Sequence, residues 1–327
     1  MTISISTPAI SKPAISKPAI SLKNLTKNFG DTHVLKGLTV EIEENTIVGL
    51  FGRNGVGKTT LMSILSNQEQ ATGGTAQVYG HNIWENPEAT NRICFIRENQ
   101  KYPEEAKLAH VLKAAADFYP NWDQDFALKL EKRFRLPKKT QIKKYSRGQL
   151  SALAIVVGLA SRAPITFMDE PYLGLDPTAR DVFYELLISD FGEYPRTIVF
   201  STHLIDEAAN LFERVIVLDE GKIVLDKSIE EATESAYNLA GPALAVDELT
   251  KNLKVLKVRT LGGLKSATIS GHVTEETAQA ATQRNLEISP VSLQDLVSAL
   301  GHRDDIDPLS TRSQQSPEAL AVKEYSR

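Results

Sequence analysis

A glycine-rich loop that ends in a lysine and a threonine is the segment of this sequence best suited to chemistry. Its backbone N–H groups can turn inward around phosphate groups, where side chains would clash. The loop fits the pattern G-x-x-x-x-G-K-[ST], in which the lysine reaches the β- and γ-phosphates and the hydroxyl binds Mg²⁺. The residues expected to bind the nucleotide are Gly52, Arg53, Asn54, Gly55, Val56, Gly57, Lys58, Thr59 and Thr60.

The elements around this loop must hold it against the phosphates. Thr46 to Phe51 is apolar and β-branched, which predicts a buried strand. Thr59 to Ser66 predicts a helix, whose positive dipole end would face the bound anion. Strand, loop and helix agree, so we expect ATP or GTP binding rather than a chance glycine-rich turn.

Two acids follow a second apolar strand, Pro164 to Met168. Asp169 is placed to hold Mg²⁺ through its water shell and to complete a metal site with Thr59. Glu170 can polarise the water that attacks the γ-phosphate. Solvated acids at a strand end are the alternative interpretation, and the glycine-rich loop upstream argues against it.

Further motifs resemble the ATP-binding cassettes of ABC transporters, over about residues 20–225. Ser146-Arg147-Gly148-Gln149 looks like the signature of that family, usually L-S-G-G-Q, placed before a helix. In the family, the serine hydroxyl and the glycine amides bind the γ-phosphate held by the partner subunit. The resemblance therefore implies nucleotide contacts for Ser146, Gly148 and Gln149.

Three more positions match the family pattern. Leu175-Asp176 resembles the D-loop at the dimer interface. His203 follows a strand and resembles the switch histidine, so the catalytic residues implied are Glu170, His203 and Lys58. Phe29 matches the aromatic residue that stacks on adenine. Taken alone, the histidine would be structural and the phenylalanine a core residue, and their place in the pattern is the reason for the functional interpretation.

The signature and one nearby loop depart from the family pattern. Arg147 stands where glycine is usual, and Tyr145 where leucine is usual. The loop that normally offers a glutamine to Mg²⁺ offers Glu98, which gives Thr59, Asp169 and Glu98 as expected metal-side residues. Gln100 is a rival for that position.

Alternating strands and helices favour an α/β core with a mostly parallel sheet. The resemblance implies the P-loop NTPase fold of an ATP-binding cassette, with a RecA-like core and an inserted helical subdomain at about residues 100–162. Proline at every fifth position predicts a disordered repeat arm at 1–19. The cassette is expected at 20–235, a small C-terminal α/β domain at 242–301, and a disordered polar tail at 304–327.

Net charge, cysteine content and the length of apolar runs restrict the compartment in which the protein is expected and the partners it is expected to bind. A formal charge of −4 among 327 residues points neither to nucleic acid nor to an acidic membrane surface. A single cysteine, Cys94, fits a reducing cytosol. The longest apolar run is shorter than the roughly 20 residues of a bilayer span, so we expect a peripheral subunit at the cytoplasmic face of the cell membrane.

The resemblance implies an ATPase that powers transport through an integral membrane subunit. It would pair with a second cassette, as a homodimer or a paralogous heterodimer, in a nucleotide sandwich. A soluble cassette ATPase acting on DNA or ribosomes is the rival class, but such proteins usually carry two cassettes or a long coiled coil. A simple P-loop kinase would not need the Ser146 motif or Asp176.

Short segments of the sequence indicate the direction of transport and the surface on which the membrane subunit docks. The form of the signature and the Pro290 to Leu296 segment resemble bacterial exporter-type subunits, including those of antibiotic and multidrug export. The membrane subunit is expected to dock near the Glu98 loop and the helical block. Lysines that crowd the signature either form a solvated basic face or meet the triphosphate of the partner.

Overall fold

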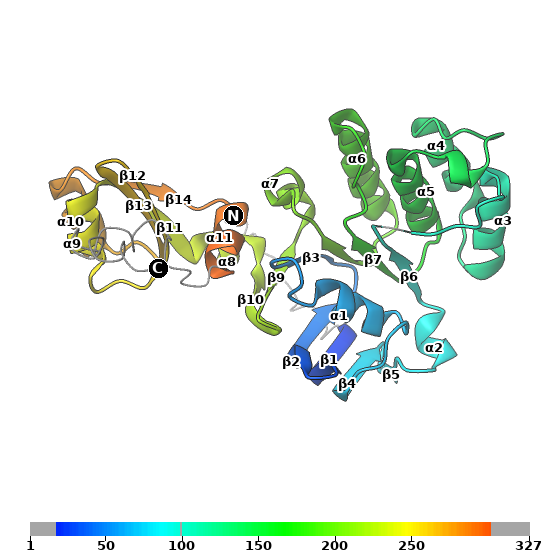
Figure 1. Cartoon of the computed structure of the whole chain (residues 1–327), viewed down its shortest axis with the longest axis horizontal. Helices are drawn as coiled ribbons and strands as arrows, with labels where there is room; N and C mark the ends of the chain where they lie inside the picture. Colours follow the sequence, from blue (N-terminus) through cyan, green and yellow to red (C-terminus); the bar gives the residue numbers. More distant parts are fainter. Residues whose placement is uncertain (1–17, 99, 302–327) are drawn as a thin grey trace, which may run out of the picture.

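Residues 18–98 and 100–301 are described by the computed structural model shown in Figure 1. All but the last two residues of the expected repeat arm, and the whole of the expected tail, lie outside these ranges. The described chain contains one sheet of six strands and two sheets of four.

The six-stranded sheet carries the glycine-rich loop. Its strands are β3 (Ile47–Phe51), β6 (Ile93–Ile96), β7 (Ile165–Asp169), β8 (Thr197–Ser201), β9 (Arg214–Asp219) and β10 (Lys222–Ser228). Their order is β10-β9-β3-β8-β7-β6, and all neighbours are parallel except the β9–β10 hairpin. Strands β3, β7 and β8 are buried along their whole length, as expected of parallel strands covered on both faces.

An antiparallel sheet packs on one face of this central sheet. Its strands are β1 (Pro18–Phe29), β2 (Thr32–Glu43), β4 (Gly73–Val78) and β5 (His81–Asn82). The expected end of the repeat arm at residue 19 is wrong by two residues, because Pro18 and Ala19 already belong to β1. Proline is tolerated at the first position of a strand, and Ala19 is fully buried.

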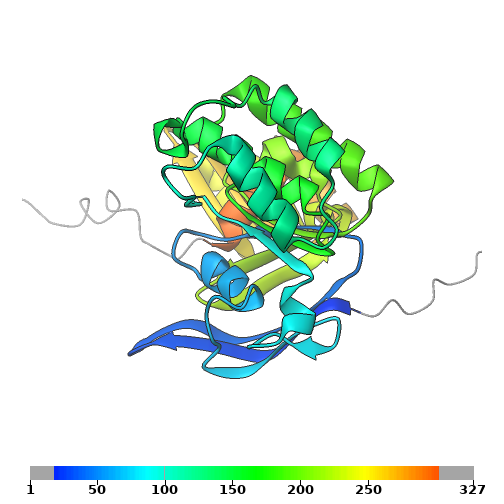
Figure 2. The same ribbon diagram turned by 90° about the vertical axis from the view of Figure 1, so that its right-hand side faces the viewer.

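Helices complete the covering of the central sheet. The inserted helical block contains α3 (Leu108–Phe118), α4 (Gln124–Arg133), the 3-10 turn η1 (Ile142–Lys144) and α5 (Arg147–Ala160). The other helices of this region are α1 (Lys58–Leu65), α2 (Pro87–Thr90), α6 (Pro177–Glu193), α7 (Ile205–Ala208) and the 3-10 turn η2 (Ala209–Leu211). Figures 1 and 2 show α3 to α6 on one side of the central sheet and the antiparallel sheet on the other.

Two hydrophobic cores result from this layering. Successive residues of a strand point to opposite faces, so Phe167 of β7 packs toward the antiparallel sheet while Met168 packs toward the helical block. Each face is thus closed by a different layer, and the strand ends are fixed from both sides.

The C-terminal sheet is antiparallel, with the order β12-β13-β11-β14. It is formed by β11 (Ala236–Pro242), β12 (Val255–Leu261), β13 (Leu264–Ser270) and β14 (Glu287–Pro290). The helices of this part are α8 (Ile229–Glu234), α9 (Ala243–Thr250), α10 (Glu275–Gln283) and α11 (Leu293–Leu300). The sheet therefore begins before residue 242, where the small domain was expected to start. The strand β11 contains alanine, asparagine, glycine and proline, which have low strand propensity. Its composition therefore did not predict a strand.

The last helix, α11, returns to the first part of the chain. Leu293, Leu296 and Val297 join the core that also contains the helical block. The backbone N–H of Gln294 donates to Asp206 at 3.1 Å. The expected domain at 242–301 thus contains a helix that packs on the cassette core as well as its own sheet.

The carboxyl ends of β3, β6, β7 and β8 lie at one edge of the sheet because these strands run parallel. This edge is where ligands bind in open α/β sheets. Within the described ranges, none of the helices combines the length and apolarity that a membrane crossing requires.

Candidate active site

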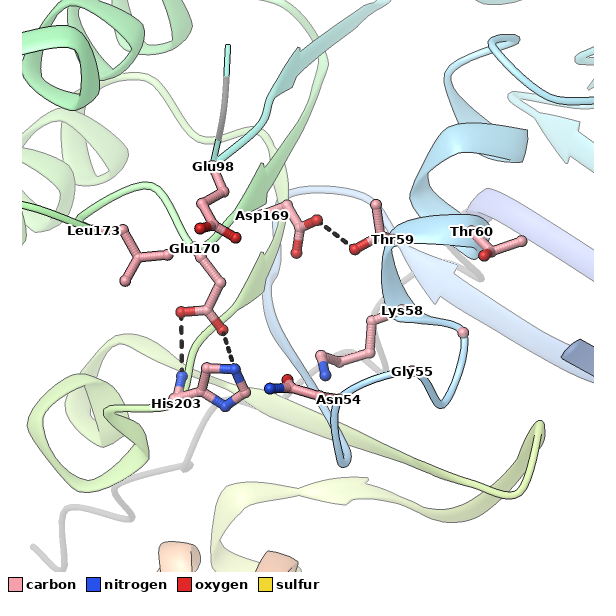
Figure 3. A pocket seen from close by; sticks show the side chains of 11 residues that line it. Asn54, Gly55, Lys58, Thr59, Thr60, Glu98, Asp169, Glu170, Leu173 and His203 are labelled. Carbon is pink, nitrogen blue, oxygen red and sulfur yellow. Dashed lines mark hydrogen bonds and ion pairs between the residues drawn. The ribbon is translucent and has the colours of Figure 1, made fainter. Parts of the chain in front are cut away.

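A cavity of about 410 Å³ opens at this edge of the sheet. Four separate loops contribute to it, each following a strand of the central sheet, and Figure 3 shows their side chains converging. The residues that line it are Asn54, Gly55, Gly57, Lys58, Thr59, Thr60, Glu98, Asp169, Glu170, Leu173 and His203. Residues predicted from four separate segments of the sequence are therefore brought together in one place.

The glycine-rich loop turns tightly at Gly57 before α1 begins. Gly57 has a φ of 114°, a conformation that residues with a Cβ rarely adopt. A Cβ added there would lie 2.6 Å from Cδ2 of Leu35. Only glycine fits this position, which leaves the backbone close enough to hold phosphate oxygens.

Lys58 is folded back over the loop. Its Nζ donates to the carbonyl oxygens of Gly52 at 2.7 Å and Arg53 at 3.2 Å. Burial lowers the pKa of Lys58, and the nearby charges of Glu170 and Asp169 offset part of that effect. Phosphate oxygens in the cavity would add negative charge beside the ammonium group and favour its charged form.

Thr59 and Asp169 meet across the cavity. The hydroxyl of Thr59 donates to Oδ2 of Asp169 at 2.6 Å, and the hydroxyl of Ser201 donates to Oδ1 at 2.5 Å. A hydroxyl and a carboxylate this close are hard oxygen ligands of the kind that Mg²⁺ prefers. The donor set fits a magnesium ion shared with nucleotide phosphates.

Glu170 is buried and has a φ of 50°. A left-handed non-glycine residue marks a position that the surrounding structure must stabilise. Nε2 of His203 lies 3.3 Å from Oε1 of Glu170, and the backbone N–H of His203 donates to Oε2 at 3.4 Å. Figure 3 shows the histidine facing this carboxylate. The structure thus places the two residues expected from separate motifs in contact.

Tyr172 was missed by the sequence analysis. Its hydroxyl donates to Oε2 of Glu170 at 2.5 Å and lies 2.5 Å from the Thr202 hydroxyl. No motif flags a tyrosine at this position, and only its proximity in sequence to Glu170 could have drawn attention to it.

The signature residues lie on α5, outside the cavity. Ser146 and Gln149 form a capping box, in which Ser146 Oγ accepts from the Gln149 N–H at 3.2 Å and Gln149 Oε1 accepts from the Ser146 N–H at 3.0 Å. A Cβ on Gly148 would lie 2.4 Å from the carbonyl oxygen of Gly174. Glycine is therefore needed at position 148 for the close approach of α5 to the segment before Asp176.

Two of the three departures from the family pattern, Arg147 and Glu98, contact each other. Arg147 donates to Oε1 of Glu98 at 2.6 Å. Glu98 lines the cavity, whereas its rival Gln100 is not among the lining residues. The carboxylate that was expected on the metal side is thus also the partner of the signature arginine within the same chain.

Seven predicted nucleotide-binding residues do not line the main cavity: Phe29, Gly52, Arg53, Val56 and the signature residues Ser146, Gly148 and Gln149. Arg53 and Val56 line a neighbouring cavity of about 410 Å³ beside Asp219 to Gly221. The guanidinium group of Arg53 also lies 3.4 Å from the carbonyl oxygen of Gly301. Phe29 is 48% exposed at the end of β1, with Nζ of Lys27 4.6 Å from its ring centroid.

Part of the basic cluster near the signature is neutralised locally. Lys138 pairs with Glu131 and Lys143 pairs with Glu105, each at 2.5 Å. These two lysines form ion pairs within the helical block.

Comparisons with known proteins identify the family of this chain. A profile of the family described as ABC transporter matches residues 35–173. An uncharacterized ABC transporter ATP-binding protein of Methanocaldococcus jannaschii is 30% identical over 219 residues, 64% of this chain and 78% of that protein. The sulfate/thiosulfate import ATP-binding protein CysA 1 of Shewanella oneidensis is 29% identical, over 62% of this chain and 56% of its own length. The daunorubicin resistance ATP-binding protein DrrA3 of Streptomyces coeruleorubidus is 29% identical, over 63% of this chain and 66% of its own length.

Solved structures show the same fold. The ATP-binding subunit of an ABC transporter superposes with a TM-score of 0.60 at 24% identity, over 65% of this chain and 91% of that one. An ATP-binding cassette solved as a dimer in a post-hydrolysis state with ADP and Pi gives a TM-score of 0.56 at 26% identity, over 64% of this chain and 98% of that one.

Proposed function

This chain belongs to the ABC transporter family as an ATP-binding cassette that hydrolyses ATP, and we propose that it powers export of a substrate through a separate membrane subunit. The observation that carries the proposal is the cavity at the carboxyl ends of the parallel strands. There the phosphate loop, Asp169 and Glu170 converge. The daunorubicin resistance relative and the exporter-like Pro290 to Leu296 segment favour export.

Six side chains of the cavity have a role in this proposal. Lys58 releases the loop carbonyls and binds the β- and γ-phosphates, while the loop N–H groups hold their oxygens. Thr59 and Asp169 hold Mg²⁺, which neutralises phosphate charge when bound. Glu98 adds a carboxylate on the same side of the cavity.

Glu170 is the general base of the proposed reaction. Its buried carboxylate takes a proton from the attacking water as the water's oxygen bonds to the γ-phosphorus and the bond to the leaving ADP oxygen breaks. His203, which faces Oε1 of Glu170, would contact the γ-phosphate and so report its presence to the loop after β8.

The signature is proposed to act on the nucleotide of a second cassette. Ser146 Oγ accepts the capping hydrogen bond, so its own O–H stays able to donate to a phosphate oxygen. The first N–H groups of α5 have no acceptor within the helix, and they carry the positive end of its dipole. A phosphate held by the partner's Lys58 would therefore be bound from both subunits.

The membrane subunit is proposed to dock on the helical block, which places the chain at the cytoplasmic face of the membrane. A groove of about 400 Å³ lies between α3 and α4 and is lined in part by Leu108, Leu112 and Leu128. Phe118 at the end of α3 is 72% exposed. Three other aromatic residues of this block, Tyr102, Tyr119 and Trp122, pack against the core.

Co-purification from membranes, followed by ATPase and transport assays, tests the proposal. The chain should co-purify with a protein containing several membrane spans, and candidate substrates should raise its ATPase rate. In inside-out vesicles with ATP outside, an exporter accumulates the substrate in the lumen. Accumulation only in right-side-out vesicles with ATP inside would contradict export, and absence of any membrane partner would contradict the transporter role.

A further inference from the structure

The hydroxyl of Tyr172 sits between the carboxylate of Glu170 and the loop that carries His203. It donates to Oε2 of Glu170 at 2.5 Å. It accepts from the backbone N–H of His203 at 2.9 Å. Tyr172 is only 3% exposed, so water does not compete for these bonds.

Counting donors and acceptors fixes the direction of the remaining bond. A phenol has one proton and two lone pairs. Since Tyr172 uses its only proton in the hydrogen bond to Glu170, the Thr202 hydroxyl must be the donor in the 2.5 Å contact with Tyr172. The Thr202 oxygen in turn accepts from the backbone N–H of Leu204 at 2.8 Å. The chain of bonds runs from the loop after β8 to one oxygen of the carboxylate.

The two oxygens of Glu170 consequently differ. Oε2 accepts the hydrogen bond from Tyr172, whereas the buried Oε1 makes no hydrogen bond among the described residues and lies 3.3 Å from Nε2 of His203. An unpartnered buried carboxylate oxygen is costly, and this one faces His203 at the cavity. It is the oxygen left to accept a proton from water.

We propose that Tyr172 is a positioning residue for ATP hydrolysis: its hydroxyl anchors Oε2 of Glu170 to the His203 loop and leaves Oε1 to receive the proton of the attacking water. The inference rests on the proposed role of Glu170 as general base. Tyr172 itself touches neither water nor nucleotide in this role.

The left-handed backbone of Glu170 explains why such an anchor is needed. With a φ of 50°, the residue lies in a conformation that persists only when neighbouring contacts hold it. The Tyr172 ring packs against Phe200, with centroids 6.2 Å apart. The ring is thus fixed to the strand that leads into the His203 loop, and carboxylate and histidine are oriented together.

Tyr172→Phe in the full-length chain tests the inference, because it removes the hydroxyl and keeps the ring. We expect kcat for ATP to fall roughly 10- to 100-fold, since a hydrogen bond to a charged group is lost. The dissociation constant of Mg-ATP should stay close to wild type, and a melting curve checks that the variant is folded at the assay temperature. A kcat within about twofold of wild type would overturn the inference.

Tyr184→Phe is a matched control. Tyr184 is also a buried tyrosine, on α6, and its hydroxyl has no hydrogen-bond partner within the described ranges. Its removal should leave kcat unchanged. An equal loss of kcat in both variants would show that any buried hydroxyl matters, and would overturn the specific role of Tyr172.

Two further variants keep the outcome readable. Thr202→Val removes the hydrogen bond from Thr202 to Tyr172 and leaves the tyrosine ring unchanged. It should lower kcat by less than Tyr172→Phe does, and an unchanged kcat would contradict the chain of bonds.

Glu170→Gln separates the two proposals. If Glu170→Gln is inactive and Tyr172→Phe is normal, the Tyr172 inference fails alone, whereas an active Glu170→Gln overturns the general base itself.

Discussion

At the residue scale, the chemistry depends on one carboxylate whose two oxygens have different neighbours. Exchanging Glu170 for glutamine keeps the size of the side chain and an oxygen able to accept from Tyr172, but removes the base. We expect turnover to fall by roughly 10²- to 10⁴-fold, while ATP binding remains. Steady-state ATPase rates and equilibrium nucleotide binding measure the two effects separately. Hydrolysis within a few-fold of wild type would exclude Glu170 as the base.

The sequence was a good guide to the residues that line the cavity and a poor guide to the side chains that orient those residues. The pattern around Lys58 identifies the loop because the ligand itself dictates glycine, lysine and a hydroxyl. Tyr172 could not be found this way, since its role depends on the distance between two strand ends. Phe29 shows the opposite limit: its position in a pattern suggested adenine stacking, whereas its structural neighbour is Lys27 within the same strand.

At the element scale, the signature serves first as the start of a helix. Ser146 caps α5, so its capping role and its proposed phosphate contact must be separated. Aspartate caps helices as well as serine does, but it offers no hydroxyl proton and repels phosphate. Ser146→Asp should therefore keep the melting temperature and lose ATPase activity.

Ser146→Ala provides the comparison for that prediction. Unlike Ser146→Asp, it removes both the hydroxyl and the helix cap. It should therefore lower the free energy of unfolding, measured by urea titration, by about 1 kcal/mol. If Ser146→Asp hydrolyses ATP normally, Ser146 is only a helix cap and its proposed contact with the partner's nucleotide is wrong.

The contact between Arg147 and Glu98 links the signature helix to the cavity. Both side chains are partly exposed, at 57% and 39%, and ion pairs of this kind contribute about 0.2–1 kcal/mol. A double-mutant cycle with Arg147→Gly and Glu98→Gln should give a coupling free energy in that range, falling as salt rises. A coupling free energy of zero at low salt would show that the two side chains do not interact in solution.

Elements with a clear local pattern of apolar residues were predicted well. Elements whose bounds depend on long-range packing were not. The strands β3 and β7 are continuous apolar runs and lie within one residue of the ranges that the sequence predicted, and β8 ends two residues before His203. Asn45, in the turn before β3, has a left-handed φ of 56°, a conformation that asparagine tolerates. The early start of β11 depends on its pairing with β13 and β14, and no local pattern reveals such partners.

At the scale of the whole molecule, α11 ties the C-terminal sheet to the cassette. Its apolar face enters the same core as the helical block, and the chain just after it reaches Arg53 of the phosphate loop. Sequence alone suggested an independent domain, because the segment from 242 to 301 has its own strands and helices. The packing of α11 could not be predicted, since an amphipathic helix does not specify which surface it covers.

The sandwich mechanism makes a prediction about two chains rather than one. If the signature acts in trans, Ser146 of one chain completes the site built by Lys58 and Glu170 of the other. Neither Ser146→Arg nor Glu170→Gln should hydrolyse ATP alone at the normal rate. Mixed, they form heterodimers with one doubly damaged site and one undamaged site, so part of the ATPase activity should return.

The outcome of mixing also distinguishes the two kinds of dimer. Recovery that rises with the fraction of mixed dimers supports a homodimer in which a single intact site can turn over. A mixture that stays silent, beside a wild-type chain that is itself inactive alone, indicates that the natural partner is a different cassette. Full activity of Ser146→Arg at every protein concentration would contradict the sandwich mechanism. If the start of α5 lay against a partner's nucleotide, the bulky arginine side chain at position 146 would obstruct that contact and lower the activity.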